Sequence, residues 1–331
     1  MAGSGGGCGV TTVWRDGHLI ESKPGTAPVE AGWGAFTTVG CDGGHPLLWT
    51  RHRSRLAASL RMLGAGNDVT LPDESALREL LRAGGLNGAA RLRVVGRRRR
   101  ILARKSHRLA TKAGDMPQSA TFSRFGVLDV LSSTTPRPSG RKHHISRHLA
   151  GLATQRGEKC GRGWTVEASA SVVEAVGPDA PPARLSLQRW RAAPTLAGHK
   201  TLARLPWDMA RELARREGAD DALLVDEEGH VLETAIANVW LCRGHDLRTP
   251  PAPERCLPGI MRGWLFENAA ALGLQALECD LTEADLLGAD ELWISNAVGG
   301  VRRVASVAGR EWRSWPCFER LILLGVPAPG W

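Results

Sequence analysis

Three features within residues 200–262 constrain this chain more than any other part of the sequence. A single lysine, Lys200, occurs in the segment KTLARLPW, which indicates the opening of a helix. Glu233 follows in HVLETAIANVW, within a predicted strand that comes directly after a turn. The segment LPGIMR, at residues 257–262, is typical of a glycine turn that enters another helix. An amine, a carboxylate and a helix N-terminus are therefore predicted in this order along one stretch of chain.

Lys200 and Glu233 are candidates for chemistry on amines. The neighbourhood of Lys200 in the sequence is mostly apolar, and a desolvated lysine has a lowered pKa that leaves its amine free to attack a carbonyl. A carboxylate such as Glu233 keeps a pyridine nitrogen protonated, so that the ring can take up the electrons of a broken C–H bond. Taken singly, a solvated lysine and an exposed strand glutamate are the commoner explanations of such residues.

The segment LPGIMR is a candidate anion site. Gly259 permits a close backbone approach, and the amides of Ile260 and Met261 would point from a helix N-terminus toward an anion. Arg55, on an earlier predicted helix, could donate a charged pair of N–H groups to the same anion, although a surface arginine is the usual explanation. An amine for an aldehyde, a carboxylate for a ring nitrogen and amides for a phosphate are together what holding pyridoxal phosphate requires.

Six segments, in order and with their spacing, resemble the class IV aminotransferases, which are the fold-type IV pyridoxal phosphate enzymes. These segments are RHRSRL, HKTLARLPW, ADDALLVDEEGHVLETAIANVWL, LRTPP, LPGIMR and ADELWISNAVGGVRRV, and the resemblance covers residues 12–96 and 164–310. It implies an α/β (α+β) fold with a smaller N-terminal α+β domain and a larger C-terminal α/β pseudo-barrel domain. It also implies a homodimer that acts on a small amino substrate.

The same resemblance assigns roles to individual residues. Lys200 is implied to be the Schiff-base lysine and Glu233 the partner of the pyridine nitrogen. The residues implied to contact or support the phosphate are Arg55, Asn238, Gly259, Ile260, Met261 and Ala297. Asn238 is expected to be structural support, and Ala297 would offer only its backbone N–H where aminotransferases often have a hydroxyl. That loss would cost about 1 kcal/mol in cofactor binding.

Within the family, three details resemble aminodeoxychorismate lyase more than the aminotransferases. They are the methionine of GIMR, the segment SNA at residues 295–297 and the segment GAFTT at residues 34–38. They favour a lyase that converts 4-amino-4-deoxychorismate to 4-aminobenzoate and pyruvate, a reaction of folate synthesis. An aminotransferase on branched-chain or D-amino acids is the alternative, and Ala203 departs from the lyase pattern, which usually has asparagine there.

A basic segment at residues 97–162 interrupts the resemblance. It carries 16 Lys and Arg against three acidic residues, a local charge of +13, which leaves −4 for the rest of a chain whose net charge is +9. One interpretation is a disordered insertion that binds acidic partners, and the other is a non-functional or wrongly translated stretch. We favour the second, because aromatic residues are sparse and no nucleic-acid motif is present. A non-catalytic scaffold whose basic insertion binds nucleic acid is a second alternative. The four histidines of the basic segment have no cysteines at metal-ligand spacing, so no metal site is predicted there.

The rest of the pattern predicts two domains, at residues 11–195 and 196–325, after a flexible leader at residues 1–10. Strands are expected around an Asp-Gly turn at residues 16–17, at 34–40, at 90–95 and from 164, and helices at 52–64 and from Asp73. Residues 177–198 are expected to be a proline-containing connection. The sequence contains no membrane span or secretory signal, and the seven scattered cysteines favour a reducing compartment, so a cytoplasmic location is expected.

Overall fold

The computed structural model describes residues 11–22, 33–67, 69–98, 163–190 and 194–331. The described residues belong to one compact unit. The predicted leader at residues 1–10 lies outside the described residues, and so does the basic segment apart from Arg97 and Arg98. Predictions about the state or function of that segment therefore stay predictions.

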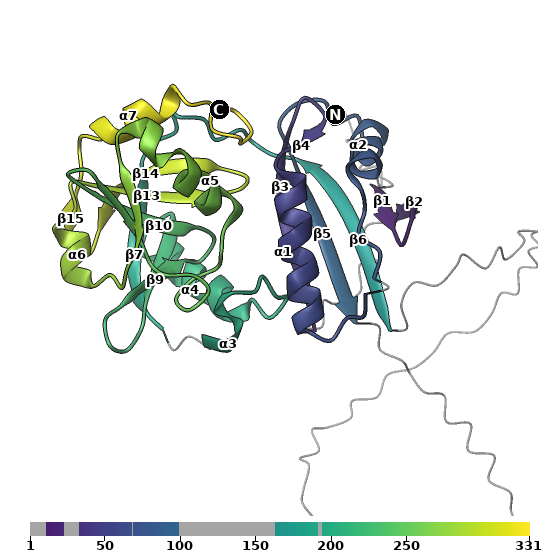
Figure 1. Ribbon diagram of the computed structural model, residues 1–331, viewed down its shortest axis with the longest axis horizontal. Coiled ribbons are helices and arrows are strands. Elements are labelled where there is room, and N and C mark those ends of the chain that lie inside the picture. Colours follow the sequence, from purple (N-terminus) through teal and green to yellow (C-terminus); the bar gives the residue numbers. More distant parts are fainter. Residues whose placement is uncertain (1–10, 23–32, 68, 99–162, 191–193) are drawn as a thin grey trace, which may run out of the picture. The chain divides into compact units, whose positions relative to one another are not determined.

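The first sheet has six strands in the order β2-β1-β6-β5-β3-β4, and all neighbouring pairs are antiparallel (Figure 1). Its strands are β1 (Thr11–Arg15), β2 (His18–Ser22), β3 (Gly34–Asp42), β4 (His45–Pro46), β5 (Ala90–Arg98) and β6 (Trp164–Val172). Asp16 and Gly17 have positive φ angles of 48° and 100° and form the tight turn between β1 and β2. The hairpin predicted from the Asp-Gly pair is thereby confirmed.

Two helices pack on the first sheet, α1 (Trp49–Met62) along β3 and α2 (Glu74–Ala83) against β1 and β4 (Figure 1). The first predicted helix is confirmed, although it begins before the expected His52. The start of α2 is as predicted, because the Asp73 carboxylate accepts a hydrogen bond of 2.8 Å from the backbone N–H of Ala76. Leu56, Leu60, Leu77, Leu80 and Leu81 are buried between the helices and the sheet, and Leu63 packs against this core partly buried.

The two strands that flank the basic segment are direct neighbours. β5 and β6 pair in register from Ala90 opposite Val172 to Arg98 opposite Trp164. The predicted strand at residues 90–95 is confirmed and extends to Arg98, and the strand predicted from Trp164 is confirmed as well. The intervening residues therefore connect two adjacent antiparallel strands, which is the position of a hairpin loop.

The second sheet has nine strands, paired both parallel and antiparallel, in the order β12-β11-β10-β13-β14-β7-β8-β9 with β15 beside β14. Its strands are β7 (Ala183–Arg189), β8 (Asp221–Val225), β9 (Val231–Thr234), β10 (Asn238–Arg243), β11 (Asp246–Thr249), β12 (Gln275–Glu278), β13 (Glu291–Asn296), β14 (Gly300–Val307) and β15 (Arg310–Glu311). The sheet curls so that β9 contacts β10. Two curled sheets with helices confirm the predicted mixed α/β fold class.

The helices of this region are α3 (Pro194–Ala197), α4 (Leu205–Arg216), α5 (Ile260–Asn268), α6 (Glu283–Leu287), α7 (Pro316–Ile322) and a 3-10 turn, η1 (Ala269–Leu272). Thr282 and Asp285 form a reciprocal capping box at the start of α6. Large aromatic side chains, including Trp240, Trp293 and Phe318, are fully buried beneath α5 and α7. Helix α7 was not predicted.

Strand β7 corrects the sequence interpretation, which is wrong in treating residues 183–189 as part of a connection. β7 pairs in parallel with both β8 and β14, and it belongs to the second sheet although it precedes the expected boundary at residue 195. Its inward-facing Ala183 and Leu185 are buried. Its apolar residues alternate with polar ones, which is a strand pattern, but Pro181 and Pro182 directly before it made the segment resemble a connection.

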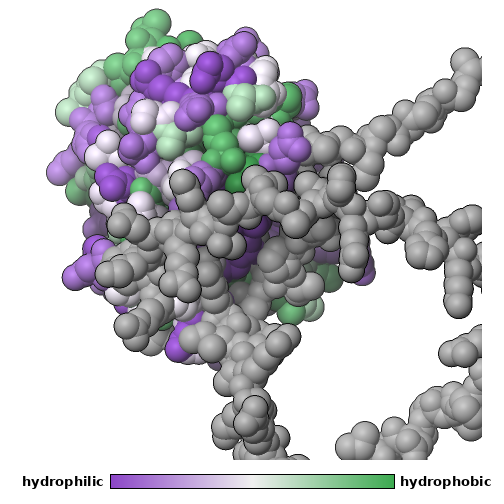
Figure 2. All heavy atoms as spheres, turned by 90° about the vertical axis from the view of Figure 1, so that its right-hand side faces the viewer, coloured by the Kyte–Doolittle hydropathy of each residue, from purple (hydrophilic) through white to green (hydrophobic). Residues whose placement is uncertain are grey.

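The surface carries both hydrophilic and hydrophobic side chains. On the part of the face in Figure 2 that is not drawn in grey, hydrophilic and hydrophobic residues are interspersed. Exposed hydrophobic side chains are ordinary on protein surfaces, because polar atoms do not suffice to cover a folded chain. Among the described residues, no helix is long and apolar enough to cross a membrane.

Candidate functional site

A cavity of about 450 Å³ is lined by residues from both sheets. The lining residues named in the sequence analysis are Arg55, Lys200, Glu233, Asn238, Gly259, Ile260 and Ala297. Met261 is the exception: its side chain is fully buried in the core beside α5, so only its backbone amide is a candidate for ligand contact. The fold therefore brings seven of the eight predicted site residues to one cavity.

Lys200 does not begin a helix, which corrects the sequence interpretation. Its carbonyl accepts a hydrogen bond of 2.9 Å from the Phe36 N–H, and the Leu202 N–H donates to the Gly34 carbonyl at 2.9 Å. Lys200 is thus held against the start of β3. Helix α4 begins only at Leu205, where Pro206 takes a first-turn position that needs no N–H donor.

The surroundings of Lys200 disfavour its charged form. Its Nζ lies 5.0 Å from the centre of the Phe36 ring, a contact that by itself favours the cation and is outweighed by burial and by nearby positive charges. Burial is the main cause that lowers the pKa of Lys200 to about 7, and the positive charges of Arg204 and Arg55 act in the same direction while Glu233 opposes them. A substantial fraction of the amine is therefore neutral, and nucleophilic, near pH 7.

Glu233, on β9, has both carboxylate oxygens hydrogen-bonded. Its Oε1 accepts from Trp207 Nε1 at 3.2 Å and its Oε2 from the Leu257 N–H at 3.1 Å. Burial raises the pKa of Glu233, whereas the Leu257 bond, the charge of Lys200 and the Trp207 bond act to lower it. The two donors fix the orientation of the carboxylate at the cavity wall.

The turn before α5 is held by Asn238, the first residue of β10. Its Nδ2 donates to the Leu257 carbonyl at 2.8 Å, and its Oδ1 occupies the space that a Cβ on Gly259 would need. Ile260 and Met261 then open α5, where the first amides have no acceptor within the helix. Gly259 therefore makes room for Asn238, and its predicted role beside an anion stays a prediction.

Arg55 reaches the same turn from α1. Its NH1 donates to the Pro258 carbonyl at 3.2 Å and its NH2 to Thr37 Oγ1 at 3.1 Å. Burial lowers the pKa of Arg55 to about 10, against the opposing charge of Glu233, so the guanidinium stays cationic at neutral pH. Its Nε is buried and has no hydrogen-bond partner among the described residues.

Ala297 lines the cavity just after β13. The preceding Asn296 folds the chain back, because its Oδ1 accepts from the N–H groups of Val298 at 3.0 Å and Gly299 at 2.8 Å. The segment SNA thus forms a side-chain-stabilised turn at the cavity edge.

Three residues of the cavity region were missed by the sequence analysis. Phe36 faces the Lys200 amine, Trp207 bonds Glu233, and Arg204 donates to the Ala235 carbonyl at 2.6 Å. Arg204 and Trp207 lie four and seven residues after Lys200, a spacing that would have placed them on its side of a helix. Lys200 in fact precedes α4, so the helical spacing alone does not show that Arg204 and Trp207 lie near it.

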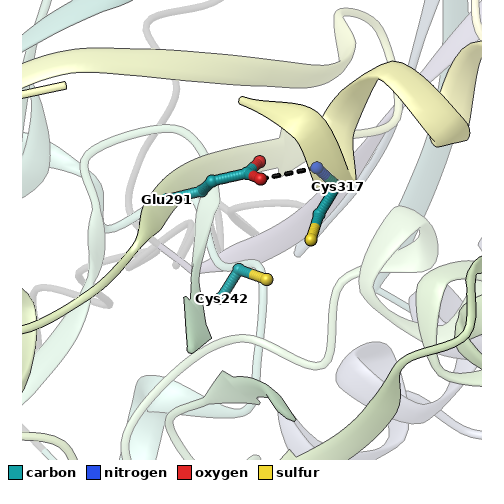
Figure 3. Close-up of side chains that lie close together, drawn as sticks. All are labelled: Cys242, Glu291 and Cys317. Carbon is teal, nitrogen blue, oxygen red and sulfur yellow. Dashed lines mark hydrogen bonds between the residues drawn. The ribbon is translucent and has the colours of Figure 1, made fainter. Parts of the chain in front are cut away.

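Cys242, Glu291 and Cys317 form a second cluster, shown in Figure 3, whose potential metal-ligand atoms lie within 4.8 Å of one another. The Glu291 carboxylate, however, accepts from the N–H groups of Cys317 at 2.5 Å and Phe318 at 3.1 Å and from Trp293 Nε1 at 2.9 Å. It thus satisfies the buried start of α7. Burial raises the pKa of the Cys242 thiol, which keeps it protonated. These contacts account for the cluster without a metal.

A half-exposed group of Asp226, Glu228 and His230 is likewise occupied by a protein cation. Arg255 NH1 donates to Asp226 Oδ2 at 2.7 Å, and the His230 ring shares that oxygen at 3.1 Å.

A partly neutral lysine, an oriented carboxylate, an arginine and a helix N-terminus around one cavity define an enzyme site suited to amine and carbonyl chemistry. A family profile described as "Amino-transferase class IV" matches residues 100–307 of this chain. The chain belongs to the class IV aminotransferase family.

Two curated relatives and one solved structure illustrate the similarity. An aminodeoxychorismate lyase of Vibrio harveyi is 32% identical over 120 residues, which cover 36% of this chain and 44% of the relative. A putative branched-chain-amino-acid aminotransferase of Methanocaldococcus jannaschii is 33% identical over 111 residues, 34% of this chain and 38% of the relative. Each match spans less than half of the relative's own length.

The structure of a branched-chain aminotransferase from Thermoproteus uzoniensis, with norvaline, superimposes with a TM-score of 0.69 and 21% identity, covering 96% of this chain and 93% of that one. This likeness confirms the predicted fold-type IV architecture. Class IV aminotransferases use pyridoxal phosphate as their cofactor.

Proposed function

We propose that this chain is a pyridoxal phosphate enzyme whose amine is Lys200. The observation that carries the proposal is the lowered pKa of Lys200, about 7, in a cavity that also presents Glu233 and the start of α5. Buried amines with lowered pKa values are typical of lysines that bond carbonyl carbons.

The residues of the cavity fit the cofactor. Lys200 would bond its aldehyde carbon, and Glu233 would face its ring nitrogen. Arg55, with a buried Nε that has no partner among the described residues, and the amides that open α5 would take the phosphate. Ala297, which also lines the cavity, would add its backbone N–H.

The bound cofactor would supply an electron-withdrawing ring, and the protein would supply orientation and proton transfer. Lys200 Nζ, with a pKa near the working pH, would take the proton from the amine-bearing carbon of the substrate. Glu233 would keep the ring nitrogen protonated, since its two hydrogen-bond donors hold it at the cavity wall as a carboxylate.

We propose further that the reaction is the conversion of 4-amino-4-deoxychorismate to 4-aminobenzoate and pyruvate. The similarity to the Vibrio harveyi lyase supports it, and so do the segments GAFTT and SNA, which both reach the cavity through Phe36, Thr38 and residues 295–297. After Lys200 removes the proton, the enolpyruvyl ether would leave as pyruvate, and aromatisation of the ring would make the elimination favourable. We expect a homodimer in the cytoplasm.

A class IV aminotransferase is the second candidate, because the Methanocaldococcus jannaschii relative is matched at 33% identity, nearly the same as the lyase. Its substrates would be branched-chain or D-amino acids. The same Lys200 would then return the proton to the cofactor carbon, and a 2-oxo acid would be required as acceptor.

The two reactions can be distinguished because only the aminotransferase requires a 2-oxo acid as acceptor of the amino group. Purified chain loaded with pyridoxal phosphate is incubated with aminodeoxychorismate alone, and separately with an amino acid and 2-oxoglutarate. Appearance of 4-aminobenzoate and pyruvate without an oxo acid supports the lyase, whereas glutamate formation supports the aminotransferase. Lys200→Ala should abolish either activity and the visible absorbance of the lysine-bound cofactor. A wild type that stays colourless after incubation with the cofactor would exclude both.

A further inference from the structure

His52, on α1, is buried and makes one hydrogen bond that reaches the cavity indirectly. Its Nδ1 lies 2.7 Å from Thr37 Oγ1, and both side chains are fully buried. Neither residue lines the cavity. The same Thr37 oxygen accepts from Arg55 NH2 at 3.1 Å. His52, Thr37 and Arg55 therefore form a chain of hydrogen bonds that ends at the candidate anion site.

The direction of the bonds follows from the donors available. Arg55 can only donate, so the Thr37 oxygen is its acceptor, and the Thr37 hydroxyl keeps one proton to donate. An imidazole Nδ1 without a proton is the acceptor that lies within reach. Burial lowers the pKa of His52 well below its usual range, and the charges of Arg55 and Lys200 add to this effect. A neutral ring with its proton on Nε2 accepts the Thr37 hydrogen bond at Nδ1, although the buried Nε2 has no partner among the described residues.

The guanidinium is thereby fixed at two points. Thr37 holds NH2 and the Pro258 carbonyl holds NH1, while the buried Nε has no partner among the described residues. A buried N–H without an acceptor costs free energy unless a ligand accepts from it. Arg55 thus has two nitrogens, NH1 and NH2, held by the protein and a third, Nε, that is still free to donate. This is the arrangement expected of an arginine that is oriented to bind an anion.

We propose that Thr37 and His52 are positioning residues that orient Arg55 toward the phosphate of the cofactor. The inference rests on the proposed cofactor site. It concerns the phosphate end alone, so it can be tested apart from the chemistry at Lys200.

Pyridoxal, which lacks the phosphate, is the discriminating probe. Dissociation constants of pyridoxal phosphate and of pyridoxal are measured from the visible absorbance of the lysine-bound form, for wild type and for Thr37→Val. This substitution removes the hydroxyl and keeps the shape. We expect pyridoxal phosphate to bind about tenfold more weakly or worse to Thr37→Val, because a hydrogen bond to a charged group is lost. Pyridoxal affinity should be unchanged, and Thr37→Ser should restore phosphate discrimination.

Thr249→Val is the matched control, because Thr249 is also fully buried and its hydroxyl donates to the Val239 carbonyl at 2.8 Å, outside the cavity lining. It should change neither constant. Equal weakening of both probes in Thr37→Val, or of neither, would overturn the positioning role while leaving the proposed cofactor site intact. A wild type that binds neither probe would overturn both.

The wild-type chain provides a test that does not depend on a folded variant. Long-range proton–nitrogen NMR spectra of histidine-labelled protein report which ring nitrogen of His52 carries the proton. The expected result at pH 7 is a neutral ring protonated on Nε2. If Nδ1 carries a proton, or if the ring is charged, the Thr37 hydroxyl has no acceptor on His52. Either result would overturn the proposed chain of hydrogen bonds.

Discussion

The side-chain oxygen of Asn238 occupies the space that the first side-chain carbon of any residue other than glycine would take at position 259. The amide nitrogen of the same side chain donates to the Leu257 carbonyl at 2.8 Å. One asparagine at the start of β10 thereby sets both the path of the turn and the place where α5 begins. The position of the amides of Ile260 and Met261 thus depends on packing in the second sheet.

Gly259→Ala should displace Asn238 or the turn and so weaken the anion site. We expect pyridoxal phosphate to bind at least tenfold more weakly and the free energy of unfolding to fall by about 1–3 kcal/mol, the usual cost of forcing atoms into a packed site. Absorbance titration and denaturant unfolding measure the two effects. Gly263→Ala, in the same helix, is the control, because its Cβ would meet only the end of Arg51 at 3.7 Å. A Gly259→Ala chain that matches this control would refute the coupling.

The reactivity of Lys200 should titrate near neutrality. With a pKa of about 7, the amine is mostly charged below that pH and mostly neutral above it, so the rate of reductive alkylation of the cofactor-free protein should rise with a midpoint near pH 7. A lysine in a model peptide, with a pKa of about 10.4, serves as reference. Peptide mass spectrometry gives the rate at this residue.

The neighbours of Lys200 set the direction in which this midpoint moves. Arg204→Met removes a positive charge and should shift it upward, whereas Glu233→Gln removes the opposing negative charge and should shift it downward. Shifts in the same direction, or a wild-type midpoint near that of the reference peptide, would contradict the electrostatic account.

Trp207→Phe should loosen Glu233 without emptying the space beside it. The variant loses the Nε1–H bond to Glu233 Oε1 and keeps the Leu257 bond to Oε2. We expect about tenfold weaker binding of both pyridoxal and pyridoxal phosphate, because the ring nitrogen is affected in each. Trp190→Phe is the control, since Trp190 packs against the same apolar cluster. Equal effects of the two substitutions would assign the loss to packing.

Glu291→Ala should strongly destabilise the fold, whereas treatment with a metal chelator should leave its stability unchanged. The substitution leaves two buried N–H groups, of Trp293 and Phe318, and the part-buried N–H of Cys317 without an acceptor, which should lower the free energy of unfolding by about 3 kcal/mol or more. Treatment of the wild type with EDTA should leave the melting temperature unchanged, because these N–H groups occupy the carboxylate. A marked fall with EDTA would instead indicate a metal at Cys242, Glu291 and Cys317.

A chain with residues 100–161 replaced by a short turn should fold. Arg98 and Trp164 are register partners, so few residues are needed to join β5 to β6. The melting temperature and the cofactor absorbance should stay close to those of the full chain. Salt-dependent binding to DNA, if the full chain shows any, should disappear with the segment; unchanged binding would exclude this segment as the binder.

Local patterns were enough to predict much of the fold. The Asp-Gly turn, the start of α2 at Asp73 and the strand from residue 90 are each encoded by neighbouring residues, and each is confirmed. β7 was not predictable in this way, because its partners β8 and β14 lie far along the chain and only its membership of the second sheet explains its burial.

The site residues that lie within the family's motifs could be predicted from the sequence. The residues whose roles depend on contacts between distant segments could not. Arg55, Lys200 and Glu233 were named from their segments, and the structure gathers them at one cavity. The roles of Thr37 and His52 depend on which face of β3 meets α1, which the sequence does not specify. For Gly259 the local pattern suggested a ligand, whereas the close neighbour is Asn238, another distant residue.

Lys200 and Leu202 are hydrogen-bonded through their backbones to Phe36 and Gly34 at the start of β3, while Glu233 and the turn before α5 belong to the second sheet. A ligand bonded to the Lys200 amine and seated on that turn would act as a cross-link between the two sheets. Because such a ligand binds the folded chain only, its free energy of binding adds to the stability of both sheets together. Loading with cofactor should therefore raise the melting temperature of the two sheets together.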